Sequence, residues 1–184
     1  IPASVFYTAV PFGMTAQEAN GWLHYGGGLE LWRELYAPFG VVPFAGGSTG
    51  VQMAGWFNIR LNTRADLKGL KMRIPGLAGE VFDAAGGSAV RIAGGEVYTS
   101  MQTGVIDAVE WVGPYNDRTL GLMEVGDYYY YPGWHEPGAM LETIVNAEAL
   151  ASLPEDLQAI VRVAARATNT CLLYTSDAAD EHGC

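Results

Sequence analysis

Residues 94–111, GGEVYTSMQTGVIDAVEW, join a helix pattern to a strand pattern without a loop between them. Apolar residues recur four positions apart, as on one buried face of a helix: Val97, Met101 and Val105. Gly104 follows in the position of a helix-ending glycine, and residues 106–112 read as a short apolar strand. The segment therefore predicts a helix over residues 96–104 that leads directly into a strand.

The segment before it repeats this alternation of strand and helix. Residues 71–74 and 89–92 read as strands, and residues 80–85 between them read as a helix. Strands that alternate with helices are typical of βαβ units, whose strands pair in parallel. The sequence therefore predicts an α/β fold with at least partly parallel pairing.

Local signals predict the remaining elements. Thr15 with Glu18 three residues later is a capping-box sequence, so a helix is expected to follow toward residue 25. Residues 1–12 read as an extended apolar segment. Further strands are expected at residues 41–44, 51–58, 128–134 and 141–146, and further helices at residues 117–125 and 154–168.

The composition limits the classes of function. The chain has 184 residues, of which 49% are hydrophobic, and this is enough for one globular domain or two small lobes. Its net charge of -10 argues against a nucleic-acid partner, whose phosphates need clustered basic residues. No apolar run reaches the roughly 18 to 20 residues that span a bilayer. Any bound anion must therefore be held by local geometry against an unfavourable overall charge.

Arg73 and Glu110 are each expected at the end of a predicted strand. A carboxylate next to Trp111 in an apolar stretch needs a partner. One explanation is an anionic ligand held between Arg73 and a cation that Glu110 helps to bind. The alternatives are a surface arginine that ends a strand and a strand-end carboxylate that neighbouring groups satisfy.

Several strings resemble one known family. DLKGLKMRIPG at residues 66–76 and the opening segment resemble the arginine strand and the helix-strand signature of the DctP-type extracytoplasmic solute-binding proteins of TRAP transporters. Four more strings resemble the branch that binds 2-oxo and 2-hydroxy monocarboxylates such as pyruvate and lactate: AVPFGMTAQEANGW, GVQMAGWFN, EWVGPYND and YYYYPGWHEPG. The resemblance covers about residues 1–168.

The resemblance implies a two-lobed, type II-like periplasmic-binding-protein architecture. This chain would be a fragment of it, dominated by the second lobe with part of the first. The implied function is periplasmic capture of a small monocarboxylate and its delivery to the TRAP membrane permease, without catalysis. The C-terminal helices of some relatives mediate dimerisation, which leaves a homodimer of the full-length protein as an open alternative.

The resemblance divides the chain into two segments. Residues 1–169 are the fragment of the binding domain. Residues 170–184 introduce both cysteines and read as a non-native tail, because TCLLYTSDAADEHGC resembles read-through of a sequencing adapter.

The resemblance also implies site residues. By motif position, Arg73 pairs with the ligand carboxylate. Gln52, Glu110 and the main-chain carbonyl of Trp111 occupy the positions that hold a metal ion against the ligand, sodium or, in some relatives, calcium. Gln52 and Trp111 would then also lie at the ligand. Hard cations prefer such oxygen donors.

The other candidates have ordinary explanations beside the functional one. Trp134 either contacts ligand or packs in the core, and Asn116 either contacts ligand or caps the helix after it. A glutamine such as Gln52 is also common on an exposed strand face. His135 beside Glu136 is expected to be a solvated pair in a turn.

Two rival functions use the same residues differently. An enzyme acting on a small carboxylic acid would use Glu110 as general base and Arg73 to hold the substrate. The chain has no Ser-His-Asp set and no CxxC or HExxH motif to support it. An interaction module built on the aromatic residues 128–131 lacks any repeat.

Overall fold

The computed structural model describes residues 1–181, with side chains described through residue 172. The chain forms two compact units. Unit 1 consists of Ile1–Ala9, Gly13–Val51 and Pro137–Cys184, and unit 2 consists of Val10–Phe12 and Gln52–Glu136. Each unit combines helices with strands, which confirms the α/β class. Among the described residues, no helix has both the length and the apolar character needed to cross a bilayer.

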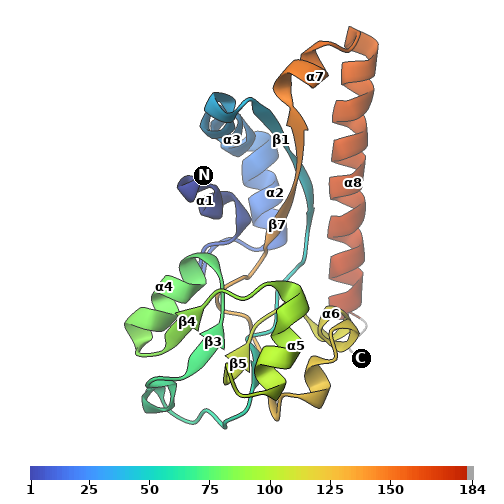
Figure 1. Cartoon of the computed structure of the whole chain (residues 1–184). Coiled ribbons are helices and arrows are strands. Elements are labelled where there is room, and N and C mark those ends of the chain that lie inside the picture. The colour runs from blue at the N-terminus through green and yellow to red at the C-terminus, as the bar shows by residue number, and fades with distance from the viewer. Residues whose placement is uncertain (182–184) are drawn as a thin grey trace. The chain divides into compact units, whose positions relative to one another are not determined.

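Unit 1 is built on a two-stranded antiparallel sheet of β1 (Val41–Ser48) and β7 (Met140–Asn146). Figure 1 shows the long helix α8 (Glu155–Glu181) running beside this sheet. The other helices are α1 (Val5–Thr8), α2 (Ala16–Tyr25), α3 (Gly28–Tyr36) and α7 (Ala147–Ala151). The predicted capping box is confirmed, because Thr15 and Glu18 exchange both hydrogen bonds at the start of α2. The core of the unit comprises Ala19, Leu23, Trp32, Tyr36, Ala45 and Met140.

Two predictions for unit 1 differ from the structure. Residues 1–12 are not extended, because Pro2–Ser4 forms a 3-10 helix and α1 follows it. A short apolar run has no periodicity that separates a strand from a helix. Helix α8 runs to Glu181 rather than ending near residue 168. That residues 170–184 are non-native stays a prediction, and residues 182–184 lie outside the described part of the chain.

Unit 2 contains a five-stranded sheet in the order β4-β3-β5-β2-β6. Its strands are β2 (Gly55–Phe57), β3 (Lys71–Arg73), β4 (Ser88–Val90), β5 (Ala108–Val109) and β6 (Tyr128–Tyr130), and its helices are α4 (Gly76–Ala85), α5 (Gly94–Gln102) and α6 (Pro114–Thr119). Strand β3 pairs in parallel with β4 and β5, whereas β2 is antiparallel to β5 and β6. The predicted βαβ arrangement with partly parallel pairing is confirmed.

Each face of this sheet packs against a different helix. Phe57, Met72 and Ala108 form a core with Phe82 of α4. The neighbouring residues along the strands point the other way, so Trp56 and Val109 pack with the face of α5 that carries Val97 and Met101. Gly104 lies just past the end of α5 with a φ of 70°, as expected of a helix-ending glycine. Strands β3 and β5, held between these two cores, end side by side.

Candidate functional site

The carboxyl ends of β3 and β5 bring Arg73 and Glu110 together. Arg73 pairs in register with Val109, and the Glu110 N–H donates to the Arg73 carbonyl over 3.1 Å. Arg73 Nη1 donates to the Glu110 carbonyl over 2.8 Å and also forms an ion pair with the Glu110 carboxylate. The Arg73 side chain is 15% exposed and that of Glu110 is 1% exposed. The predicted strand-end positions are confirmed, and the two charges meet directly.

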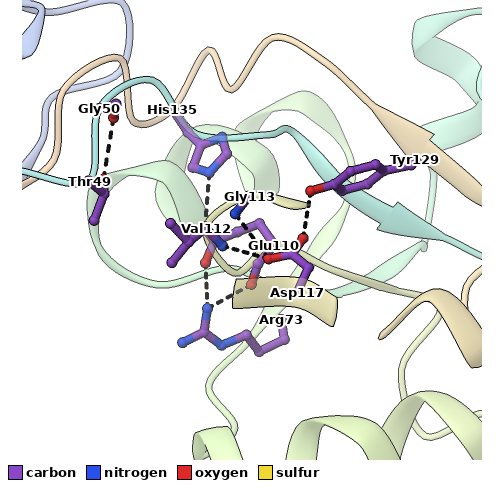
Figure 2. Close-up of polar contacts among 9 residues, drawn as sticks. All are labelled: Thr49, Gly50, Arg73, Glu110, Val112, Gly113, Asp117, Tyr129 and His135. Carbon is purple, nitrogen blue, oxygen red and sulfur yellow. Dashed lines mark hydrogen bonds and ion pairs between the residues drawn. The ribbon is translucent and has the colours of Figure 1, made fainter. Parts of the chain in front are cut away.

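His135 is the second partner of Glu110, as Figure 2 shows. Its Nε2 lies 3.0 Å from Glu110 Oε2, and its side chain is fully buried. The prediction of a solvated His135 is therefore wrong. Backbone hydrogen bonds to Gln52 hold the turn: Gly133 N–H donates to the Gln52 carbonyl over 2.7 Å, and Gln52 N–H donates to the Glu136 carbonyl over 3.1 Å.

Glu136 is a site residue that the sequence reasoning missed. Burial and the nearby Glu110 carboxylate raise the pKa of Glu136 from 4.5 to about 7, although His135 and Arg73 act in the opposite direction. Each of the two carboxylates disfavours the ionised form of the other, because like charges repel strongly where water is largely excluded. The only sequence signal was the His-Glu pair itself, which local reasoning assigned to solvent.

Gln52 is buried, with 3% of its surface exposed. The alternative of an exposed strand-face glutamine is therefore excluded. Met53 N–H donates to the Val112 carbonyl over 2.9 Å. Together with the two bonds between Gln52 and the 133–136 turn, this contact links the Gln52 segment to Glu136 and to the backbone two residues after Glu110.

The Trp111 ring is half-buried and lies against the Arg73 guanidinium, whose Cζ is 4.9 Å from the ring centroid. On the α5 side, a Cβ added to Gly94 would lie 2.7 Å from the end of the indole. The absent side chain at Gly94 therefore makes room for Trp111, which in turn covers Arg73.

Gly94→Ala is expected to displace the Trp111 indole and destabilise the protein by about 1 to 3 kcal/mol, as overpacking does. Gly95→Ala is the matched control, since a Cβ there meets open space at the neighbouring position of α5. Urea unfolding monitored by tryptophan fluorescence measures both. Equal stability of the two variants would contradict this account of Gly94.

The structure does not bring Trp134 and Asn116 into this cluster directly. Trp134 packs against the core that contains Phe57 and lines an apolar cavity of about 580 Å³, although its ring also meets His135 edge-on at 5.5 Å between centroids. Asn116 is exposed on α6. The capping alternative for Asn116 is wrong, because α6 begins at Pro114 and Asn116 lies inside it.

The cluster offers oxygen donors rather than a set of charged metal ligands. Within the described residues, no group of three or more His, Cys, Asp or Glu side chains is placed to hold a metal ion. Two of the predicted donors, the Gln52 amide and the Trp111 main-chain carbonyl, are not among these side-chain types. Gln52 and Glu110 are both buried, and Trp111 directly follows Glu110.

The chain is similar to proteins of one family over almost its whole length. The model of the DctP family, described as bacterial extracellular solute-binding protein, family 7, matches residues 2–182. A monocarboxylate 2-oxoacid-binding periplasmic protein of Nostoc sp. is 48% identical over 177 residues, which are 96% of this chain and 49% of that protein.

Crystal structures of TRAP periplasmic solute-binding proteins share the fold. One from Pseudoalteromonas atlantica T6c, with bound sodium and pyruvate, has a TM-score of 0.91 at 48% identity and covers 95% of this chain and 53% of its own. One from Colwellia psychrerythraea, with bound calcium and pyruvate, has a TM-score of 0.92 at 48% identity. The match covers 96% of this chain and 54% of that protein. A third, from Bordetella bronchiseptica RB50, is a mixed-occupancy dimer with copurified calcium and picolinate. It is 41% identical with a TM-score of 0.91, and the match covers 96% of this chain and 52% of that protein.

This chain spans about half the length of these relatives. Their fold matches the architecture expected from the sequence, that of a periplasmic-binding-protein-like fragment. The family consists of extracytoplasmic solute-binding proteins and not of enzymes. From the family match and the 48% identity, the chain belongs to the DctP family, family 7 of the bacterial extracellular solute-binding proteins.

Proposed function

We propose that the chain is part of a periplasmic TRAP solute-binding protein that captures a small 2-oxo monocarboxylate such as pyruvate, together with a metal ion. Arg73 pairs with the ligand carboxylate in this proposal. Gln52, Glu110, the Trp111 carbonyl and Glu136 hold the cation. The loaded protein delivers its ligand to the membrane permease, and a 2-hydroxy acid such as lactate is the second ligand class.

The geometry of Arg73 is the observation that carries this proposal. Among the described residues, its hydrogen bonds all come from Nη1 and all go to Glu110. A guanidinium has five N–H donors, so three on Nε and Nη2 remain for a carboxylate. Because Glu110 and Trp111 fix the head group from two sides, little rotamer freedom is lost when an anion binds.

The donor set fits a hard cation. Gln52 supplies an amide oxygen, Glu110 and Glu136 supply carboxylates, and Trp111 supplies a main-chain carbonyl, all from segments joined by backbone hydrogen bonds. Glu110 already contacts Arg73 and His135, but a carboxylate offers about four lone-pair positions. A bound cation would neutralise the repulsion between the two carboxylates and attract the ligand anion. The relatives with pyruvate hold either sodium or calcium, and both ions accept such oxygen ligands.

The remaining assignments follow from the same proposal. Trp134 contacts the ligand at the end of the site that His135 occupies, and Asn116 contacts it from α6. The relative that crystallised as a dimer supports a homodimer of the whole protein.

Calorimetric titration of the purified protein with pyruvate, lactate and 2-oxobutyrate tests the proposal. Saturable binding is expected, with the ligand recovered unchanged in its proton NMR spectrum. Turnover of pyruvate, or no heat with any of the three acids, would contradict the proposed function.

Stability in metal-free buffer is expected to fall as the pH rises from about 4.5 to 7. In this range Glu136 is protonated in the folded protein and ionised in the unfolded chain, because its folded-state pKa is raised to about 7. Protonated Glu136 therefore contributes its full stabilisation at pH values below its pKa in the unfolded chain. This contribution, at most roughly 3 kcal/mol, is lost as the pH rises through the pKa of Glu136 in the folded protein.

Urea unfolding at several pH values measures this dependence. Glu136→Gln is expected to flatten the profile, while Glu80→Gln, at an exposed position on α4, should leave it as in the wild type. If the free energy of unfolding of Glu136→Gln depended on pH as in the wild type, Glu136 would not be the group responsible.

A further inference from the structure

Asp117 is a buried carboxylate, 1% exposed, that neither the sequence reasoning nor the proposed site uses. It accepts four hydrogen bonds, and Figure 2 draws those from Val112, Gly113 and Tyr129. Oδ1 accepts from the backbone N–H groups of Val112 and Gly113 over 3.1 and 3.0 Å. Oδ2 accepts from Trp56 Nε1 over 3.2 Å and from the Tyr129 hydroxyl over 2.8 Å. The two oxygens thus serve different parts of unit 2.

The Oδ2 bonds fix Asp117 itself. Trp56 of β2 and Tyr129 of β6 are opposite each other in the sheet, and their rings stack with centroids 4.1 Å apart. Both polar groups point at Oδ2, so the carboxylate is anchored to the sheet. Burial raises the pKa of Asp117 despite these four donors.

The Oδ1 bonds fix the backbone that follows Glu110. A trans peptide group is planar, with its N–H and C=O pointing in opposite directions. When the Val112 N–H points at Asp117, the Trp111 carbonyl of the same peptide group must point away from Asp117. The next peptide group is held at both ends, because Gly113 N–H donates to Asp117 and the Val112 carbonyl accepts from Met53 N–H over 2.9 Å.

We infer that Asp117 is a positioning residue that orients the Trp111 carbonyl toward the bound cation. This inference rests on the proposed function, since it gives Trp111 its role. Asp117 touches neither cation nor ligand and acts through the N–H groups of Val112 and Gly113. Loss of such an outer hydrogen bond typically lowers metal affinity about 10- to 100-fold.

Asp117→Ala tests the inference because it removes both acceptor oxygens, and with them the hydrogen bonds from Val112 and Gly113. An asparagine would not serve, because its oxygen can still accept from Val112 and Gly113 while its NH2 group donates to the Tyr129 hydroxyl. Tyr129→Phe is the matched control, since it removes one Oδ2 bond and leaves the Oδ1 bonds in place.

Two readouts separate orientation from general stability. Backbone hydrogen exchange of Val112 and Gly113, followed by NMR, reports directly on the Oδ1 bonds. Calorimetric titration with calcium in saturating pyruvate reports on the cation. In folded Asp117→Ala the two amides should exchange at least about 10-fold faster, and calcium affinity should fall about 10-fold or more. In Tyr129→Phe calcium affinity should stay within about twofold of the wild type, whatever its stability.

Each contrary outcome has a distinct meaning. Unchanged exchange of both amides in Asp117→Ala would overturn the inference, as would unchanged calcium affinity. Equal loss of calcium affinity in the two variants would reduce Asp117 to a stabilising residue and overturn it as well. Failure of the wild-type protein to bind calcium and pyruvate would instead overturn the proposed function, and with it the role of the Trp111 carbonyl.

Discussion

Arg73→Lys is expected to lower the affinity for pyruvate about 100-fold, or roughly 2.7 kcal/mol. Lysine keeps the charge but loses the planar fork that meets a carboxylate with two parallel hydrogen bonds. It also loses the flat group that lies against the Trp111 ring and donates to the Glu110 carbonyl. Calorimetric titration with pyruvate at saturating sodium measures the change.

Arg91→Lys is the matched control for this experiment. Arg91 directly follows β4 as Arg73 ends the neighbouring β3, but its side chain is exposed. Its replacement should leave pyruvate affinity within about twofold, because exposed charges contribute little. Wild-type affinity in Arg73→Lys would remove Arg73 from the ligand site.

Glu110→Gln is expected to abolish the cation dependence of pyruvate binding. The variant keeps the shape of the side chain but removes the charge that attracts the cation. It also leaves the Arg73 guanidinium without its carboxylate in a place where it is 15% exposed. Breaking a buried pair in this way typically costs about 3 to 5 kcal/mol of stability, so a fall in the unfolding midpoint is expected too.

Two measurements on Glu110→Gln distinguish the cation site from simple unfolding. Circular dichroism establishes the folded fraction, and pyruvate titrations with and without calcium are then compared on folded protein. Glu80→Gln, on the exposed surface of α4, should retain both the stability and the calcium response of the wild type. A full calcium response in folded Glu110→Gln would show that Glu110 is not a cation ligand.

The sequence predicted the part of the site that follows from local patterns. Helix periodicity and the glycine after it fixed the βαβ order, and parallel strands must end at the same edge of a sheet. Arg73 and Glu110, 37 residues apart, were each expected at the end of a strand, and the structure places them in contact.

The residues that surround Glu110 could not be predicted in this way. His135 reaches Glu110 because residues 133–136 fold back onto Gln52 through backbone hydrogen bonds, and no local period records such contacts. Asp117 reads as an ordinary acid at a helix start, yet its partners on β2 and β6 lie 61 and 12 residues away. Burial of polar groups depends on these distant partners, whereas strand and helix patterns depend on near neighbours.

The central claim is that a cation and Arg73 hold one carboxylate together. The most direct test is the affinity for pyruvate as a function of cation concentration, measured by calorimetry in a metal-free potassium buffer and with added sodium or calcium. Pyruvate affinity should rise at least about 10-fold as either ion saturates, and cation affinity should rise by the same factor in pyruvate, because coupling between sites is reciprocal. Equal pyruvate affinity in metal-free buffer and in saturating sodium and calcium would contradict the claim.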